Sequence, residues 1–273
     1  MFQPLPSTGG EDAESLAAAE RRIPALLRHR ERAVTAEDYR RLAQEVPGAE
    51  VGRVDVLPRF KPRERRFEVP GVVSVMVLPA RAPGPAPNPR PDRPFIERVH
   101  AYLAARTPLA TECYVIGCEY VALGLSVAVV IRDGFAREAV LFEVRETLRR
   151  LLWPLPPHGP GGAGWPLRRA VREREIEVEI SRVAGVAEVA GINLFERGEA
   201  DGTPAWRLLT RNTADGSQQL DLSPWQLPEL LGVLVVDVAP GSGAHAAPSS
   251  LAALPNPFAD DGAVAVPVVP EVC

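Results

Sequence analysis

Carboxylates, which can do acid–base chemistry, gather in one short run of this sequence. Four glutamates occupy alternate positions of residues 173–179, close enough for two of them to serve as general acid and base. However, Ile176, Ile180 and Val183 recur in the same run at helical spacing, and arginines alternate with the glutamates. This pattern is typical of a charged helix with one face in solvent, and we interpret it as structural.

Metal ligands and nucleophiles are scattered along the chain. There is no CxxC and no pair of histidines at ligand spacing. The residues concerned are His29, His100, His158, His245, Cys113, Cys118 and Cys273. The glycine run of residues 161–164 has no GK[ST] after it and no strand before it, so it is not a phosphate-binding loop. Because GxSxG and HExxH are also missing, we predict no catalytic residue, no metal and no cofactor.

A second group with recognisable chemistry is the basic run RFKPRERRFE, residues 59–68. Its positive side chains are Arg59, Lys61, Arg63, Arg65 and Arg66. The run also contains Phe60 and Phe67, and aromatic rings between basic residues can stack on nucleic-acid bases. The alternatives are a solvated hairpin loop and a loop that grips an acidic protein partner. The formal net charge of −4 favours these alternatives, so nucleic-acid binding is the runner-up interpretation.

Composition describes a chain of 273 residues, long enough for one to three domains with real cores. Hydrophobic residues make up 46% of it, which disfavours global disorder. The N-terminal MFQPLPSTGGEDAE has neither the basic nor the apolar region of a signal peptide. No run reaches the ~18 apolar residues that a membrane helix needs. We therefore expect no leader and no membrane segment.

The pattern of elements predicts an α+β fold, with two small two-layer α/β modules after a helical lead-in and an extended C-terminal tail. The first module is expected to contain strands and helices in the order β-β-α-β-β-α, and the second repeats the theme on a smaller scale. The expected boundaries are 1–49 for the lead-in, 50–153 for the first module, 154–164 for a Pro/Gly linker, 165–239 for the second module and 240–273 for the tail.

The lead-in ends in the most informative stretch of the chain, RHRERAVTAEDYRRLAQEVPGAEVGRVDVLP, residues 28–58. Thr35 is placed to cap a short helix from about Ala36 to Gln44, because its hydroxyl can accept an otherwise unpaired main-chain N–H. Tyr39 lies on the apolar face of this helix, and a Pro-Gly pair ends it before a strand.

Three stretches carry a family resemblance through their order and spacing. They are RERAVTAEDY with LA and PG after it (residues 30–48), PRP leading into IERV (89–99), and GWPL followed by a helix and VAGV (164–186). Together, over about residues 13–238, they resemble the baseplate J-like family, the baseplate assembly proteins of contractile phage tails and contractile injection systems. Many members of that family carry further domains before the matching stretch.

The resemblance implies a structural role, since the family supplies no catalytic residues. Its members form the wedge of the baseplate, link the hub and spike to the sheath, and hold the state that precedes firing. For this chain it implies several copies in a ring, with other baseplate subunits as partners: a second wedge protein, the hub or spike, the sheath and the tube initiator. It also implies assembly in the bacterial cytoplasm, then a place in a phage-tail-like particle.

Arginines, two aromatic residues and three valines are the candidates for contacts with such partners, because arginine and aromatic side chains suit protein interfaces. The candidates are Arg30, Arg32, Tyr39, Arg59, Arg63, Arg65, Arg66, Trp165, Val264, Val266 and Val268. The valines belong to residues 240–273, which we expect to contact a partner subunit and not this chain's own core. There GAVAVPVV can add a strand to a partner's sheet edge, with Pro267 and Pro270 limiting it to one side.

Overall fold

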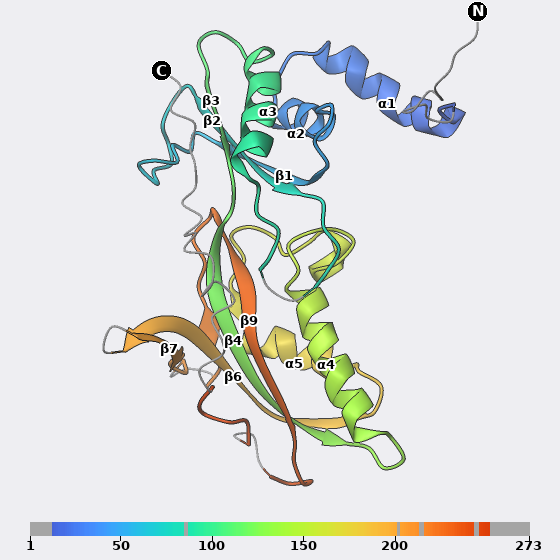
Figure 1. The fold of residues 1–273 in the computed structure, drawn as a ribbon, viewed down its shortest axis with the longest axis vertical. Helices are drawn as coiled ribbons and strands as arrows, with labels where there is room; N and C mark the ends of the chain where they lie inside the picture. The colour runs from blue at the N-terminus through green and yellow to red at the C-terminus, as the bar shows by residue number, and fades with distance from the viewer. Residues whose placement is uncertain (1–12, 85–86, 201–202, 213–215, 243–245, 252–273) are drawn as a thin grey trace, which may run out of the picture.

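The computed structural model describes residues 13–84, 87–200, 203–212, 216–242 and 246–251. Helices and strands alternate along the chain, and Figure 1 shows them gathered into two modules stacked along the long axis, with α1 projecting from one end. The fold is α+β, as the sequence predicted. The elements are α1 (Leu16–His29), α2 (Ala36–Gln44), β1 (Val51–Pro58), β2 (Val72–Pro79), α3 (Arg93–Ala104), β3 (Glu112–Ile116), β4 (Glu119–Ile131), α4 (Arg137–Leu151), η1 (Pro160–Gly162), β5 (Val171–Arg172), α5 (Glu173–Ser181), β6 (Val186–Ala200), β7 (Thr203–Leu208), β8 (Gln219–Leu220) and β9 (Gln226–Asp237).

The small module consists of α2, β1, β2, α3 and β3. Its three strands lie in the order β1-β2-β3, with β1 and β2 antiparallel and β2 and β3 parallel. The helices α2 and α3 bury their apolar faces against the valines of this sheet. Residues that form this core include Tyr39, Leu42, Val75, Val77, Ile96, Val99, Leu103 and Val115.

Side-chain caps decide where the two helices of the small module begin. Thr35 Oγ1 accepts the main-chain N–H of Asp38 at 3.2 Å, and Asp38 Oδ2 accepts the N–H of Thr35 at 2.8 Å. This reciprocal capping box confirms the predicted cap at Thr35. In α3, Asp92 Oδ1 accepts the N–H of Phe95 at 2.9 Å, and Pro94 occupies the first turn, where its missing N–H costs nothing.

The large module consists of β4, α4, α5 and the strands from β5 to β9. Its main sheet has the order β7-β6-β4-β9, in which β4 is antiparallel to β6 and parallel to β9. Figure 1 shows α4 and α5 together on one side of this sheet. Leu123, Leu125, Val127 and Val129 of β4 point toward the helices and are fully buried. This face is the larger of the two cores.

The structure corrects the grouping of β4 and α4, which the sequence analysis placed in one module with β1 and β2. Both belong to the large module, because the hydrogen-bonding neighbours of β4 are β6 and β9. The order of elements along a chain does not say which sheet a strand joins. A long central strand such as β4 needs partners on both edges, and both partners come after it in the sequence.

The stretch expected to be a Pro/Gly linker, residues 154–164, is part of the large module's packed interior. Leu155 is buried, and Trp165 directly after the stretch is fully buried. The N–H of Trp165 donates to Trp153 O at 2.9 Å, which folds the chain back on itself. Gly164 sits at φ +78°, and a Cβ there would collide with the main chain of Pro154. Glycine at this position therefore lets two segments of main chain pass in direct contact.

Residues 246–251, the strap, lie across the sheet face opposite the helices. Asn193 Nδ2 donates to Ala247 O at 3.1 Å, Ser126 Oγ donates to Pro248 O at 2.5 Å, and Ala247 is buried. Leu251 lies against Gly124, where any Cβ would collide with it. The expectation that all of residues 240–273 avoid this chain's own core is therefore wrong for the strap. Residues 252–273 lie outside the described residues.

Candidate interaction surfaces and the module junction

A buried arginine joins the small module to the large one. Arg53 on β1 is 8% exposed, and its Nη1 donates to Pro154 O and to Trp165 O, each at 2.6 Å. Its Nε donates to Asp55 Oδ2 at 2.5 Å, which balances the positive charge. Because both acceptors are main-chain carbonyls on the crossing after α4, one guanidinium group connects the sheet of the small module to the interior of the large one.

A buried glutamate makes a second connection across the junction. Glu229 on β9 is 2% exposed and accepts hydrogen bonds from Arg90 Nη1 at 2.8 Å and Arg90 Nη2 at 2.7 Å. The N–H of Asn88 donates to the same carboxylate at 2.7 Å. The Arg90 guanidinium also lies over the Tyr120 ring, 4.7 Å from its centroid. These contacts fasten the proline-rich connector between β2 and α3 to the large module.

Aromatic rings make a third connection, through the basic loop (residues 59–68). Phe60 stacks on Trp225 with centroids 5.3 Å apart, and Phe67 lies 4.5 Å from Phe60. Glu119 Oε2 on β4 accepts a hydrogen bond from Trp225 Nε1 at 3.1 Å. The same oxygen lies 3.1 Å from Arg65 Nη2. The loop expected to project into solvent therefore lies against the large module.

The charges of the basic loop are mostly paired within the chain. Arg59 pairs with Glu68, and Lys61 Nζ lies 2.8 Å from Glu64 Oε1. Arg66 Nη1 lies 4.0 Å from Glu64 Oε2, while Arg63 is exposed and has no ion pair within the described chain. Together with the packing of both phenylalanine rings, this pairing counts against the nucleic-acid interpretation, because base stacking needs an accessible ring face.

The other predicted contact residues fall into three groups. Tyr39 and Trp165 are buried in this chain's own two cores, so they support the fold and offer no surface to a partner. Arg30 and Arg32 are exposed in the turn between α1 and α2. Val264, Val266 and Val268 lie outside the described residues. Only the exposed arginines remain as described candidates for a partner surface.

Exposed apolar side chains mark two further surfaces. On α1, Leu16 and Leu27 are 76% and 68% exposed, and the helix stands away from the body of the molecule (Figure 1). On α4, Phe142 is 58% exposed. No helix in the described ranges is long and apolar enough to cross a membrane.

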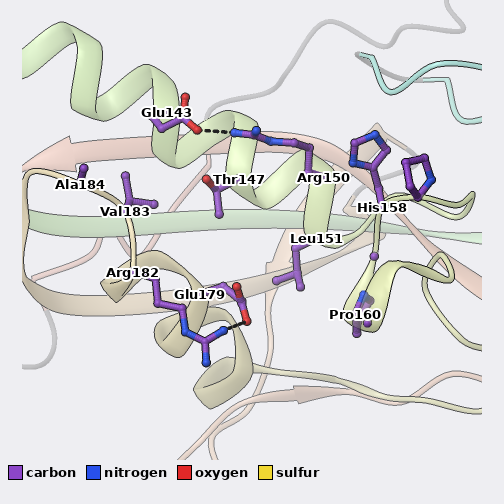
Figure 2. A pocket seen from close by; sticks show the side chains of 13 residues that line it. Glu143, Thr147, Arg150, Leu151, His158, Pro160, Glu179, Arg182, Val183 and Ala184 are labelled. Atoms are coloured by element: carbon purple, nitrogen blue, oxygen red, sulfur yellow. Dashed lines mark hydrogen bonds and ion pairs between the residues drawn. The ribbon is translucent and has the colours of Figure 1, made fainter.

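An open cavity of about 750 Å³ lies between α4, the end of α5 and the loop around His158 (Figure 2). Figure 2 shows Glu143 paired with Arg150 on one wall. On the facing wall, Glu179 Oε1 accepts a hydrogen bond from Arg182 Nη1 at 2.7 Å. The described residues contain no group of three or more acidic, histidine or cysteine side chains placed to hold a metal. The cavity walls therefore carry paired charges suited to polar contacts.

The two described cysteines, Cys113 and Cys118, are unreactive in character. Burial raises the pKa of the Cys113 thiol to about 11, and burial also raises the pKa of the Cys118 thiol. Both thiols are free in the structure. Since the thiolate is the reactive form, both residues behave as apolar packing groups at neutral pH.

Comparison with known proteins finds a relative by structure. No family model matches the chain, and no curated protein matches it by sequence. A chain in the cryo-EM structure of the anti-feeding prophage (AFP) baseplate, with sixfold symmetry applied, superposes with a TM-score of 0.55 and 20% sequence identity. The two chains share a fold. The match covers 84% of this chain and 44% of the AFP chain, so this chain spans less than half the length of that relative.

Sequence reasoning missed the residues that join the modules. Arg53 and Asp55 share a strand face with Leu57, and two opposite charges beside a core leucine signal a buried ion pair. Glu229 follows Pro228 and stands next to the apolar run of residues 230–236, and a carboxylate buried there needs a cationic partner. These signals were present, but the sequence does not name the partners.

Proposed function

We propose that this chain is a structural subunit of the baseplate of a contractile injection system or phage-tail-like particle. The observation that carries the proposal is the fold shared with a chain of the AFP baseplate over 84% of this chain. The sequence supports the proposal independently. In their order and spacing, three stretches resemble baseplate J-like proteins: residues 30–48, 89–99 and 164–186.

The finer role that we propose is that of a wedge subunit, which links the hub and spike to the sheath and helps to hold the state before firing. The junction supports this role, because Arg53 and Glu229 connect the two modules through buried, charge-assisted hydrogen bonds. Such bonds are stronger and more directional than neutral ones, so the modules form a stiff plate. A stiff plate transmits force between neighbours without changing its own shape.

The partners in this proposal are other baseplate subunits and further copies of this chain in a ring. The second wedge protein, the hub or spike, the sheath and the tube initiator are the expected neighbours. Exposed Arg30 and Arg32 and the apolar side chains of α1 are the described surfaces that we assign to them. Assembly is expected in the bacterial cytoplasm, before the subunit becomes part of a particle.

Purification from the producing cell tests the proposal. An N-terminally tagged chain should bring down sheath, tube and spike proteins, identified by mass spectrometry, and electron microscopy of the eluate should show tail-like particles. A strain that lacks the gene should yield no complete particle, and complementation should restore it. Recovery of the chain alone, at low and at moderate salt, would rule the proposal out.

A further inference from the structure

A chain of hydrogen bonds joins the strap to α5, although the two lie on opposite faces of the large sheet. Its first member is Asn193 on β6, which is 8% exposed and faces the strap. Asn193 Nδ2 donates to Ala247 O and to Pro248 O, each at 3.1 Å, so both amide hydrogens are used on the strap. Asn193 Oδ1 accepts a hydrogen bond from Arg211 Nη2, also at 3.1 Å. One side chain therefore contacts the strap and Arg211 at the same time.

Arg211 passes around the outer edge of β6. The pairing of β7 with β6 covers residues 195–200 of β6, and side chains cover the edge before that range. There Arg211 Nη2 donates to Ile192 O at 2.9 Å. Arg211 Nη1 donates to both carboxylate oxygens of Glu173, at 3.0 and 2.9 Å. Because Glu173 is the first residue of α5, a single guanidinium group spans from the strap face to the helix face.

The carboxylate of Glu173 holds this guanidinium in place. The Glu173 side chain is 15% exposed and that of Arg211 is 29% exposed, so water screens their ion pair only in part. Glu173 Oε2 also accepts the main-chain N–H of Gln218 at 2.7 Å, and the Glu173 N–H donates to Gln218 O at 3.1 Å. Charge-assisted bonds of this kind are short and directional, so the position of Arg211 depends on Glu173.

The strap itself is held mainly through residues 246–248. In addition to the bonds from Asn193, Pro248 O accepts a hydrogen bond from Ser126 Oγ at 2.5 Å. The Ala246 N–H donates to Ala190 O at 3.3 Å. Segments with few hydrogen bonds and little buried apolar surface open locally at a lower free energy than the sheet beneath them. Because the Asn193 amide supplies two of these bonds, its orientation decides how firmly the strap is seated.

We propose that the strap is a latch, and that Asn193 and Arg211 couple its seating to the start of α5. With the strap seated, its carbonyls fix the Asn193 amide, and that amide and Glu173 hold Arg211 from two sides. When the strap leaves, the Asn193 amide loses both acceptors and is free to turn. Arg211 then loses a partner, and the first turn of α5 is held less tightly. Coupling between two sites is reciprocal, so a change at Glu173 also alters the seating of the strap.

The latch gives a neighbouring subunit a means to act on the large module. The strap leads into residues 252–273, which we predict to contact a partner subunit. A partner that binds these residues and draws the strap away would loosen α5 on the opposite face of the sheet. This use of the latch rests on the proposed function, which supplies the neighbour. The coupling itself is a property of the chain alone.

Thiol labelling tests the coupling in the full-length chain. Ala247→Cys places a thiol at a buried strap position, where iodoacetamide reaches it only when the strap opens. Glu173→Gln removes the charge that holds Arg211 and should speed labelling by about tenfold, within the usual range of coupling between sites. Glu175→Gln is the matched control, because Glu175 lies in the same turn of α5 and pairs with Arg169 instead. With this control, the labelling rate should stay within about twofold of that of the parent chain.

Two further substitutions calibrate the labelling. Cys273→Ser removes the thiol of the last residue, and the raised pKa values of Cys113 and Cys118 keep those two thiols slow to react. Ser126→Ala removes a hydrogen bond of the strap itself and should speed labelling without any contact to Arg211.

Two labelling results would overturn the proposal. The first is a Glu173→Gln chain that labels at the rate of its parent, whatever the effect of Ser126→Ala. The second is equal acceleration by Glu173→Gln and Glu175→Gln, because that would reflect a general loosening of α5.

Hydrogen exchange measures the coupling in the other direction and leaves Glu173 intact. Ser126→Ala loosens the strap, so the amide of Gln218, which donates to Glu173, should exchange at least about threefold faster. Amides of α3 in the small module are the internal control and should keep their rates. Unchanged exchange at Gln218 would overturn the proposal even if Glu173→Gln fails to fold. Both measurements use the purified chain and no particle, so their failure is distinguishable from failure of the proposed function.

Discussion

At the scale of single residues, the connections between modules depend on a few buried charges. Arg53→Ala should lower the free energy of unfolding by about 3 kcal/mol, because it leaves two buried carbonyls without a donor and Asp55 without its counter-charge. Chemical denaturation measures this change. Arg63→Ala removes an exposed arginine, so it is the matched control and should shift stability by less than about 0.5 kcal/mol. Equal effects of the two substitutions would show that the buried hydrogen bonds of Arg53 do not stabilise the fold.

The half-buried cysteines give a second prediction at this scale. Because burial raises the pKa of Cys113 and Cys118, both stay protonated up to well above neutral pH. Iodoacetamide at pH 8 should therefore leave both unmodified in the folded protein and modify both in denaturant, as peptide mass spectrometry would show. Rapid modification of either residue in the folded protein would contradict this prediction.

At the scale of elements, the strap should stabilise the large sheet. A chain that ends after Ser242 loses residues 246–251, so Ser126 and Asn193 lose their carbonyl acceptors and Ala128 loses its cover. We expect the free energy of unfolding to fall by about 2–4 kcal/mol. A chain that ends after Leu251 keeps every described contact and should melt like the full-length protein. If the two truncations melt alike, the strap does not stabilise the sheet.

Helices and strands could be predicted from local sequence signals. Contacts between residues far apart along the chain could not. The caps at Thr35 and Asp92 and the apolar spacing of the helices are encoded within a few residues, so they are legible in the sequence. The strands that pair with β4 cannot be predicted in this way, because alternating leucines and valines are compatible with many sheets. The basic loop was misplaced for a similar reason, since the stacking of Phe60 on Trp225 joins residues far apart along the chain.

At the scale of the whole molecule, the junction should make the two modules unfold together. Arg53, Glu229 and the Phe60–Trp225 stack connect them at three separate points. Calorimetry of the wild-type chain should therefore show a single transition. Combining Arg53→Ala with Glu229→Ala should split it into two, the first from the less stable module. Two transitions in the wild-type protein would show that the modules are independent.

The parallel pairing of β4 with β9 has a consequence for synthesis of the chain. β4 ends at Ile131 and β9 begins at Gln226, so the ribosome must add most of the large module before this ladder can form. Pairing between strands so distant in sequence makes folding slow, and an unpaired apolar strand is prone to aggregation while it waits. The small module, complete by Ile116, is free to fold first. Nascent chains halted between Ile131 and Gln226 are therefore the ones expected to bind chaperones most strongly.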